Sequence, residues 1–117
     1  IELKNAIRQW GNIAGLVAGI VQNDLDLIGR SLEDYIIEPV RSRLIPGFDE
    51  LKKNCMAAGA LGGGISGSGP SIFMLSKDEA TAHTIEQEMQ KIYAGLKVDF
   101  HTYVSKINKE GATVMSR

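Results

Sequence analysis

The stretch that most constrains the fold is glycine-rich and runs from Gly62 to Leu75, with the sequence GGGISGSGPSIFML. An apolar run, Ser71 to Leu75, follows the glycines directly and predicts a β-strand. Because glycine has no Cβ atom, its backbone amide can approach a ligand or another backbone closely. The stretch therefore predicts either a close-approach loop that lines a phosphate or a partner loop, or a tight hairpin with glycines at positive φ.

This loop differs from the common nucleotide-binding motifs. No Gly-Lys-Ser/Thr sequence follows the glycines, so the stretch is not a Walker A motif. A strand rather than a helix is expected after it, which argues against pyrophosphate binding at a helix N-terminus. The groups that remain for ligand binding are the backbone amides of the turn and the hydroxyls of Ser66 and Ser68.

Helical spacing of apolar residues predicts four helices around the loop. They cover residues 2–22, 25–38, 48–58 and 76–95. Asn23 or Asp24 can cap the second helix, and Pro39 should end or re-aim it, because proline disfavours helical geometry in the preceding residue. Gly59 is a natural C-terminal cap for the third helix, and Ser76–Glu79 has the pattern of a capping box for the fourth.

Alternating or continuous apolar residues predict four short strands. They cover residues 60–66, 71–76, 98–104 and 112–115. The first two flank the glycine-rich loop and should pair as a hairpin. The predicted order α-α-α-β-β-α-β-β indicates an α+β fold, an antiparallel sheet with helices packed on one face.

The first predicted helix has two distinctive faces. One is an apolar stripe that includes Leu3, Trp10 and Val21, and the other carries Gly11, Gly15 and Gly19 at four-residue intervals. The glycines form either a groove for close helix packing or a set of tolerated glycines in a buried helix. A membrane-spanning helix is not expected, because polar and charged residues interrupt the apolar run.

The segment from Glu38 to Gly47, EPVRSRLIPG, is predicted to be a structured connector because it holds two prolines. An arginine between two prolines has a restricted backbone, so Arg41 or Arg43 could clamp a carboxylate or phosphate with two hydrogen bonds. The alternative is that both arginines are solvated or pair with Glu38 and Asp34.

Other features exclude several classes of function. A net charge of −1 gives no electrostatic case for binding nucleic acid or an anionic membrane. The single cysteine, Cys55, lies on a helix core side and is interpreted as packing rather than as a nucleophile, and one cysteine fits a reducing, cytoplasmic compartment. His83 and His101 have no partner at ligand spacing, so no metal site is expected.

Three segments resemble a known family. Gly62–Ser71 is similar to the third motif of the GHMP kinase superfamily, which includes galactokinases, mevalonate kinases and homoserine kinases. The connector Glu38–Phe48 and the segment Val104–Ala112 resemble the homoserine kinase family in particular. The segments stand in the expected order and cover nearly the whole chain.

The resemblance implies that residues 1–117 form one GHMP kinase C-terminal domain with a ferredoxin-like fold. The ATP-binding N-terminal domain, with its Pro-x-x-x-Gly-Leu-Gly-Ser-Ser phosphate loop, would be a partner outside this sequence. ATP and Mg²⁺ would be bound mainly by that domain, which would also make most of the contacts with homoserine. The homoserine kinase family phosphorylates L-homoserine with ATP, in threonine biosynthesis. Arg41 matches the arginine thought to bind the substrate carboxylate, and Ser66, Gly67, Ser68 and Gly69 match the loop that faces the phosphate loop.

The resemblance places no catalytic residue in this chain, which is therefore expected to be inactive alone. Two other functions stay open at this point: a free-standing regulatory α+β module that binds a small anion or metabolite, and the C-terminal domain of another GHMP kinase. The sequence also leaves open whether the protein forms a homodimer.

Overall fold

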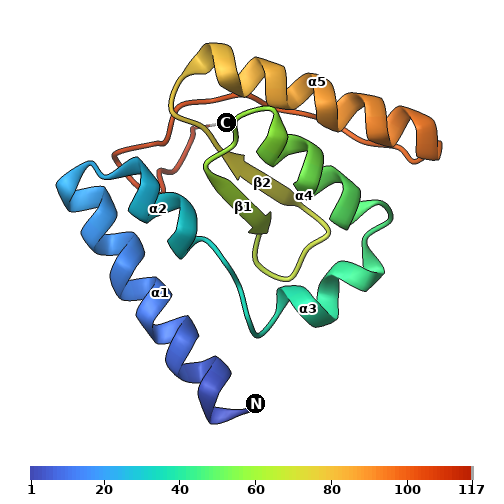
Figure 1. Cartoon of the computed structure of the whole chain (residues 1–117). Helices are drawn as coiled ribbons and strands as arrows, with labels where there is room; N and C mark the ends of the chain where they lie inside the picture. Colours follow the sequence, from blue (N-terminus) through green and yellow to red (C-terminus); the bar gives the residue numbers. More distant parts are fainter. Residues whose placement is uncertain (117) are drawn as a thin grey trace.

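The structure, a computed structural model, describes residues 1–116 and is of the α+β class (Figure 1). Its elements are α1 (Leu3–Gln22), α2 (Leu25–Ser31), α3 (Glu38–Arg41), the 3₁₀ turn η1 (Ser42–Leu44), α4 (Phe48–Ala57), β1 (Gly62–Ile65), β2 (Ile72–Leu75) and α5 (Glu79–Leu96). The predicted α+β class, with an antiparallel sheet and helices packed on one face, is confirmed.

The glycine-rich stretch forms the predicted hairpin. Strands β1 and β2 pair antiparallel, with Gly62 opposite Leu75 and Ile65 opposite Ile72. All three glycines of β1 are buried because other elements lie directly against them. A Cβ atom at Gly62 would lie 3.0 Å from the carbonyl oxygen of Gly29 in α2. The hairpin is therefore in close contact with α2.

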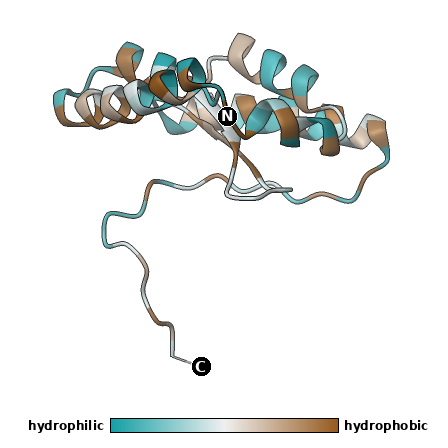
Figure 2. Cartoon of the chain, turned by 90° about the horizontal axis from the view of Figure 1, so that it is seen from below, coloured by the Kyte–Doolittle hydropathy of each residue, from teal (hydrophilic) through white to brown (hydrophobic). Residues whose placement is uncertain are grey.

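The core lies between the hairpin and the two helices α4 and α5. Leu51 and Cys55 of α4 are fully buried and pack with Ala60 and with Ile85 of α5. Partly buried side chains of β2 and α5 complete this cluster, among them Ile72, Met74, Met89 and Ile92. Figure 2 shows the helices as one layer, with the end of the C-terminal segment projecting away from it.

Helix α1 packs on α2 through its glycine face. A Cβ atom at Gly19 would lie 2.9 Å from Cγ1 of Ile28, and one at Gly15 would lie 2.5 Å from Oγ of Ser31. A Cβ atom at Gly11 would meet nothing within 4 Å. The close-packing interpretation is thus confirmed for Gly15 and Gly19, whereas Gly11 is a tolerated glycine on an exposed part of the helix.

The second helix ends earlier than predicted, at Ser31 rather than near Glu38. Asp24 caps its start as expected, by accepting a hydrogen bond from the backbone N–H of Leu27 at 3.0 Å. The carboxylate of Asp34 accepts backbone N–H groups of residues 36, 37 and 38. These bonds compete with helical ones, so the chain turns there and a new one-turn helix, α3, begins at Glu38.

Two of the four predicted strands are absent from the described residues. Residues 98–104 and 112–115 form no β-ladder. The predicted alternation holds only from residue 100 on, where Phe100, Thr102 and Val104 are half-buried while His101 and Tyr103 are exposed. Val98, which should share the buried side, is exposed. Side chains hold this segment beside α5, but no neighbouring strand offers it backbone partners.

The start of α5 also differs from the prediction. Asp78, not Ser76, is the N-terminal cap, and its carboxylate accepts the backbone N–H of Thr81 at 2.8 Å. The hydroxyl of Ser76 donates instead to the carbonyl oxygen of Asp78. Among residues 1–116, no helix combines the length and the apolarity that crossing a membrane requires.

Candidate functional site

The loop between β1 and β2 is closed by backbone hydrogen bonds. The N–H of Ser66 donates to the carbonyl oxygen of Ser71 at 2.8 Å, and the N–H of Gly69 donates to that of Ser66 at 3.1 Å. Gly67 and Gly69 have φ angles of 60° and 76°, a region that favours glycine. The predicted tight hairpin with positive-φ glycines is therefore confirmed.

The tip of this loop carries donor groups that the fold does not use. Ser66, Gly67 and Ser68 are exposed. Within residues 1–116, no hydrogen bond occupies the backbone N–H groups of Gly67 and Ser68 or the hydroxyls of Ser66 and Ser68. These donors suit the oxygen atoms of a phosphate group, although the loop supplies no basic side chain.

The connector, which contains α3 and η1, lies near the loop end of the hairpin (Figure 1). Glu38, the first residue of α3, approaches Gly64 so closely that a Cβ atom there would be 2.6 Å from its Oε2. The buried side chain of Ile45 would lie 3.6 Å from a Cβ atom at Gly69. The fold thus brings together the two segments that the sequence singled out.

Arg41 is the last residue of α3, and both Arg41 and Arg43 are exposed. The alternative prediction that these arginines pair with Glu38 and Asp34 is wrong. Glu38 pairs with Lys52, and Asp34 accepts backbone N–H groups. Neither arginine takes part in an ion pair with any residue that the structure describes, so both guanidinium groups are available to solvent or to a ligand.

Lys52 is the residue of this region that sequence reasoning missed. Its Nζ lies 2.5 Å from Oε1 of Glu38, and the two side chains are largely buried. The partners are fourteen residues apart and lie on different helices. No local spacing rule links them, so only the folded structure could reveal the pair.

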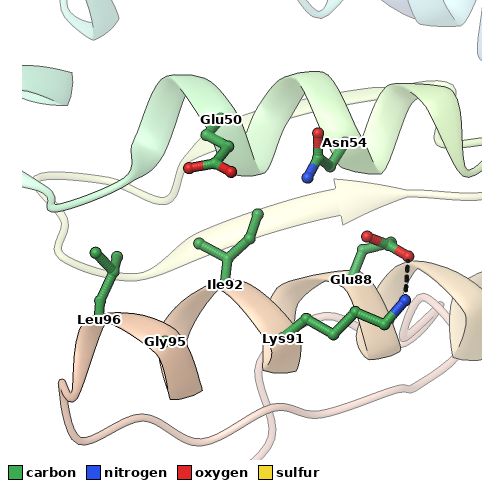
Figure 3. Close-up of a pocket in the computed structure, with 7 residues that line it drawn as sticks. All are labelled: Glu50, Asn54, Glu88, Lys91, Ile92, Gly95 and Leu96. Carbon is green, nitrogen blue, oxygen red and sulfur yellow. Dashed lines mark hydrogen bonds and ion pairs between the residues drawn. The ribbon is translucent and has the colours of Figure 1, made fainter.

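Two surface depressions lie elsewhere. One is formed by α4 and α5 and is lined by Glu50, Asn54, Glu88, Lys91, Ile92, Gly95 and Leu96, with an ion pair between Glu88 and Lys91 (Figure 3). The other follows the connector from Ser42 to Glu50 and includes Arg43. Arg41 and residues 66–69 line neither depression.

Two further predictions concern reactive side chains. Cys55 is buried as expected, and burial, together with the charge of Glu88, raises the pKa of its thiol to about 11. A thiol with that pKa is a poor nucleophile near neutral pH. His83 lies beside Glu79 and Glu86 on the exposed side of α5. Residues 1–116 contain no group of three or more histidine, cysteine or acidic side chains able to hold a metal ion.

Comparison with known protein families gives the class of protein to which the chain belongs. The family described as "GHMP kinases C terminal" matches residues 16–95, more than half of the chain. The match includes the connector, the glycine-rich hairpin and nearly all of α5. The chain belongs to the GHMP kinase C-terminal family.

The individual relatives are homoserine kinases. The chain is 49% identical to the homoserine kinase of Chlorobium phaeovibrioides over 98% of its own length and 37% of the relative. It is 46% identical to that of Chloroherpeton thalassium over 98% of its length and 36% of the relative. The crystal structure of homoserine kinase from Cytophaga hutchinsonii matches with a TM-score of 0.90 and 53% identity, over 93% of this chain and 35% of that one.

The chain therefore spans just over a third of the length of these relatives. The similarity concerns one part of a longer kinase, and it includes both the loop and the connector.

Proposed function

We propose that residues 1–117 are the C-terminal, substrate-side domain of an ATP-dependent homoserine kinase. The reaction would move the γ-phosphoryl group of ATP to the hydroxyl of L-homoserine, giving ADP and O-phosphohomoserine. The observation that carries this proposal is the 49% identity along 98% of the chain to a protein named homoserine kinase. The TM-score of 0.90 to a second homoserine kinase also supports it.

The two segments would have different roles. The loop residues Ser66, Gly67, Ser68 and Gly69 would pack beside the phosphate loop of the N-terminal domain, with their unused donors near the transferred group. Arg41 would bind the carboxylate of homoserine, because a guanidinium group can donate two parallel hydrogen bonds to a carboxylate.

Most of the remaining machinery would belong to the N-terminal domain, the expected partner. That domain would bind ATP and Mg²⁺, and the assembled enzyme would act in the cytoplasm. Phosphoryl transfer depends on positioning and charge stabilisation more than on covalent chemistry by the protein. This chain would accordingly contribute one wall of the site, orient the substrate and help to exclude water.

The role of Arg41 can be tested in the full-length enzyme with the Arg41→Ala variant. Loss of a charge-assisted hydrogen bond should raise the KM for homoserine by about 10- to 100-fold. The KM for ATP should stay within about twofold, because Arg41 would touch only the amino acid. Arg43→Ala is the matched control from the same connector and should leave both values near wild type. An unchanged KM for homoserine in Arg41→Ala would reject the assignment.

The assignment of the catalytic machinery to the N-terminal domain gives a second test. The 117 residues alone should show no ADP release that depends on ATP and homoserine, because the phosphate loop would be missing. Measurable turnover by the isolated chain in a coupled ADP assay would contradict the assignment of the catalytic machinery to the N-terminal domain.

A further inference from the structure

Glu38 carries a carboxylate that the proposed function does not use. Its side chain is 13% exposed, and one oxygen, Oε1, accepts a hydrogen bond from Nζ of Lys52, whose side chain is 18% exposed. Lys52 belongs to α4, so this largely buried pair joins the start of α3 to the helix that forms the core.

The second oxygen of Glu38 points at the glycine-rich strand. Oε2 is buried and has no hydrogen-bond partner among residues 1–116. It occupies the space that a side chain at Gly64 would fill, since a Cβ atom there would lie 2.6 Å away. The carboxylate is thus held between α4 and β1, immediately before the loop of the hairpin.

The short helix that follows Glu38 depends on such an anchor. Helix α3 has only four residues, and one turn of helix is not stable by itself. Glu38 donates its N–H to Asp34 at 3.2 Å and accepts the N–H of Ser42 with its carbonyl oxygen. Arg41 is three residues after Glu38 and therefore on the same side of this turn. Fixing the side chain of Glu38 restricts the orientation of the helical turn that carries Arg41.

A contribution to stability alone is a weak explanation for this arrangement. Exposed ion pairs contribute little, and burying a carboxylate with one unpartnered oxygen costs free energy that a pair of apolar side chains would avoid. Buried ionic groups are better attested as devices that select one arrangement of the chain. Here the arrangement selected is the placement of α3 on the hairpin.

We propose that Glu38 is a positioning residue, whose carboxylate, held by Lys52 and seated against Gly64, orients Arg41 toward the substrate carboxylate. The role rests on the proposed function, because Arg41 matters in this way only if the chain binds homoserine. Gly64 is then required because any side chain would displace the carboxylate of Glu38.

Two variants in the full-length enzyme test this from different elements. Glu38→Gln keeps the shape of the side chain but removes its charge. Gly64→Ala adds a methyl group that meets only the flexible end of Glu38. Each should raise the KM for homoserine by about five- to tenfold, with kcat and the KM for ATP within about twofold. The double variant should be no worse than the stronger single one, because both changes act through one contact.

Matched controls separate positioning from general damage. Glu50→Gln changes an exposed glutamate of α4, and Gly11→Ala adds a methyl group in open space. Both should keep wild-type kinetics. Lys52→Arg should retain most of the homoserine affinity because it keeps the positive charge. If Glu38→Gln lowers kcat and raises both KM values together, or if Gly64→Ala leaves the KM for homoserine unchanged, the positioning role is wrong.

A measurement that does not depend on enzyme activity separates failure of the positioning role of Glu38 from failure of the proposed function. In NMR spectra of the full-length protein, Glu38→Gln and Gly64→Ala should both shift the backbone and side-chain N–H signals of Arg41, and the signals of α1 should stay in place. Unchanged Arg41 signals would overturn the inference even if the wild type phosphorylates homoserine. Shifted signals in a protein that does not phosphorylate homoserine would support the placement of Arg41 by Glu38 and reject the proposed function.

Discussion

At the scale of single residues, several glycines of this chain are required by their surroundings or by their backbone conformation. Gly15, Gly19 and Gly64 each face an atom that a Cβ would strike, whereas Gly67 and Gly69 are needed for their positive φ angles. The glycine-rich appearance of the sequence therefore has two separate physical causes. The amino-acid sequence alone does not distinguish these two causes.

Cys55 allows a prediction about pH. Burial raises the pKa of its thiol from 9.0 to about 11, so the folded state holds the proton more tightly than the unfolded state does. The stability that Cys55 contributes is then fully present below pH 9 and is lost as the pH rises from about 9 to about 11.

Thiol alkylation measures this directly, because Cys55 is the single cysteine of the chain. The rate of reaction with iodoacetamide should rise near pH 11 in the folded protein and near pH 9 after unfolding in urea. A folded protein whose thiol titrates near pH 9 would contradict the buried position of Cys55.

At the scale of elements, α1 shows how a helix can bury its small residues instead of its large ones. Its glycine face packs on α2, and polar side chains such as Gln9 and Asn12 bind the backbone of residues 33–35. Its apolar stripe stays exposed, with Trp10 at 62% and Val21 at 80%. An apolar stripe indicates a helix reliably, but it does not say what will cover the stripe.

Two alanine variants of α1 test this packing. Gly11→Ala should stabilise the protein by about 0.5–1 kcal/mol, because alanine favours the helix and the added methyl group meets nothing. Gly19→Ala should destabilise it by about 1–3 kcal/mol, because the methyl group would overlap Ile28. Thermal unfolding of both variants compares an open position with a closed one on the same helix. Equal effects would show that α1 does not pack on α2 as described.

Local patterns predicted the elements well where the cause of the structure is local. The span of α1, the cap at Asp24 and the hairpin around residues 66–71 follow from spacing and turn chemistry. The end of α2 was missed because the carboxylate of Asp34 binds three backbone N–H groups beyond it. Such a turn competes with helix propensity, and the outcome depends on tertiary packing.

The predicted strand at residues 98–104 failed for a different reason. The hydroxyl of Thr102 donates to Glu86 at 2.7 Å and accepts from Gln90, so one face of this segment lies on α5 as the alternation suggests. A strand also needs a neighbour, and the alternation carries no information about one. The same limit applied to the candidate site: the sequence singled out Arg41 and the loop as candidates, but it gave no sign of the pair that Glu38 forms with Lys52.

At the scale of the whole molecule, one face of α1 exposes many large apolar side chains to solvent. Its large apolar side chains exposed by half or more are Leu3, Ile7, Trp10, Ile13, Val17, Ile20 and Val21. Monomeric soluble proteins rarely expose large contiguous apolar patches. This exposed face fits the proposal that the chain is one domain of a longer kinase. The chain's coverage of only 37% of the Chlorobium phaeovibrioides relative fits the same proposal.

The central claim is that this domain serves a kinase whose substrate is L-homoserine. The most direct test is kcat/KM of the full-length protein, measured by coupled ADP release with L-homoserine, galactose and mevalonate in turn. We predict a value for homoserine at least about 100-fold above the other two, because a site built for a zwitterionic amino acid rejects galactose, which has no charge, and mevalonate, which has a carboxylate but no ammonium group. A higher kcat/KM for another alcohol, or no ADP release that depends on homoserine, would contradict the account.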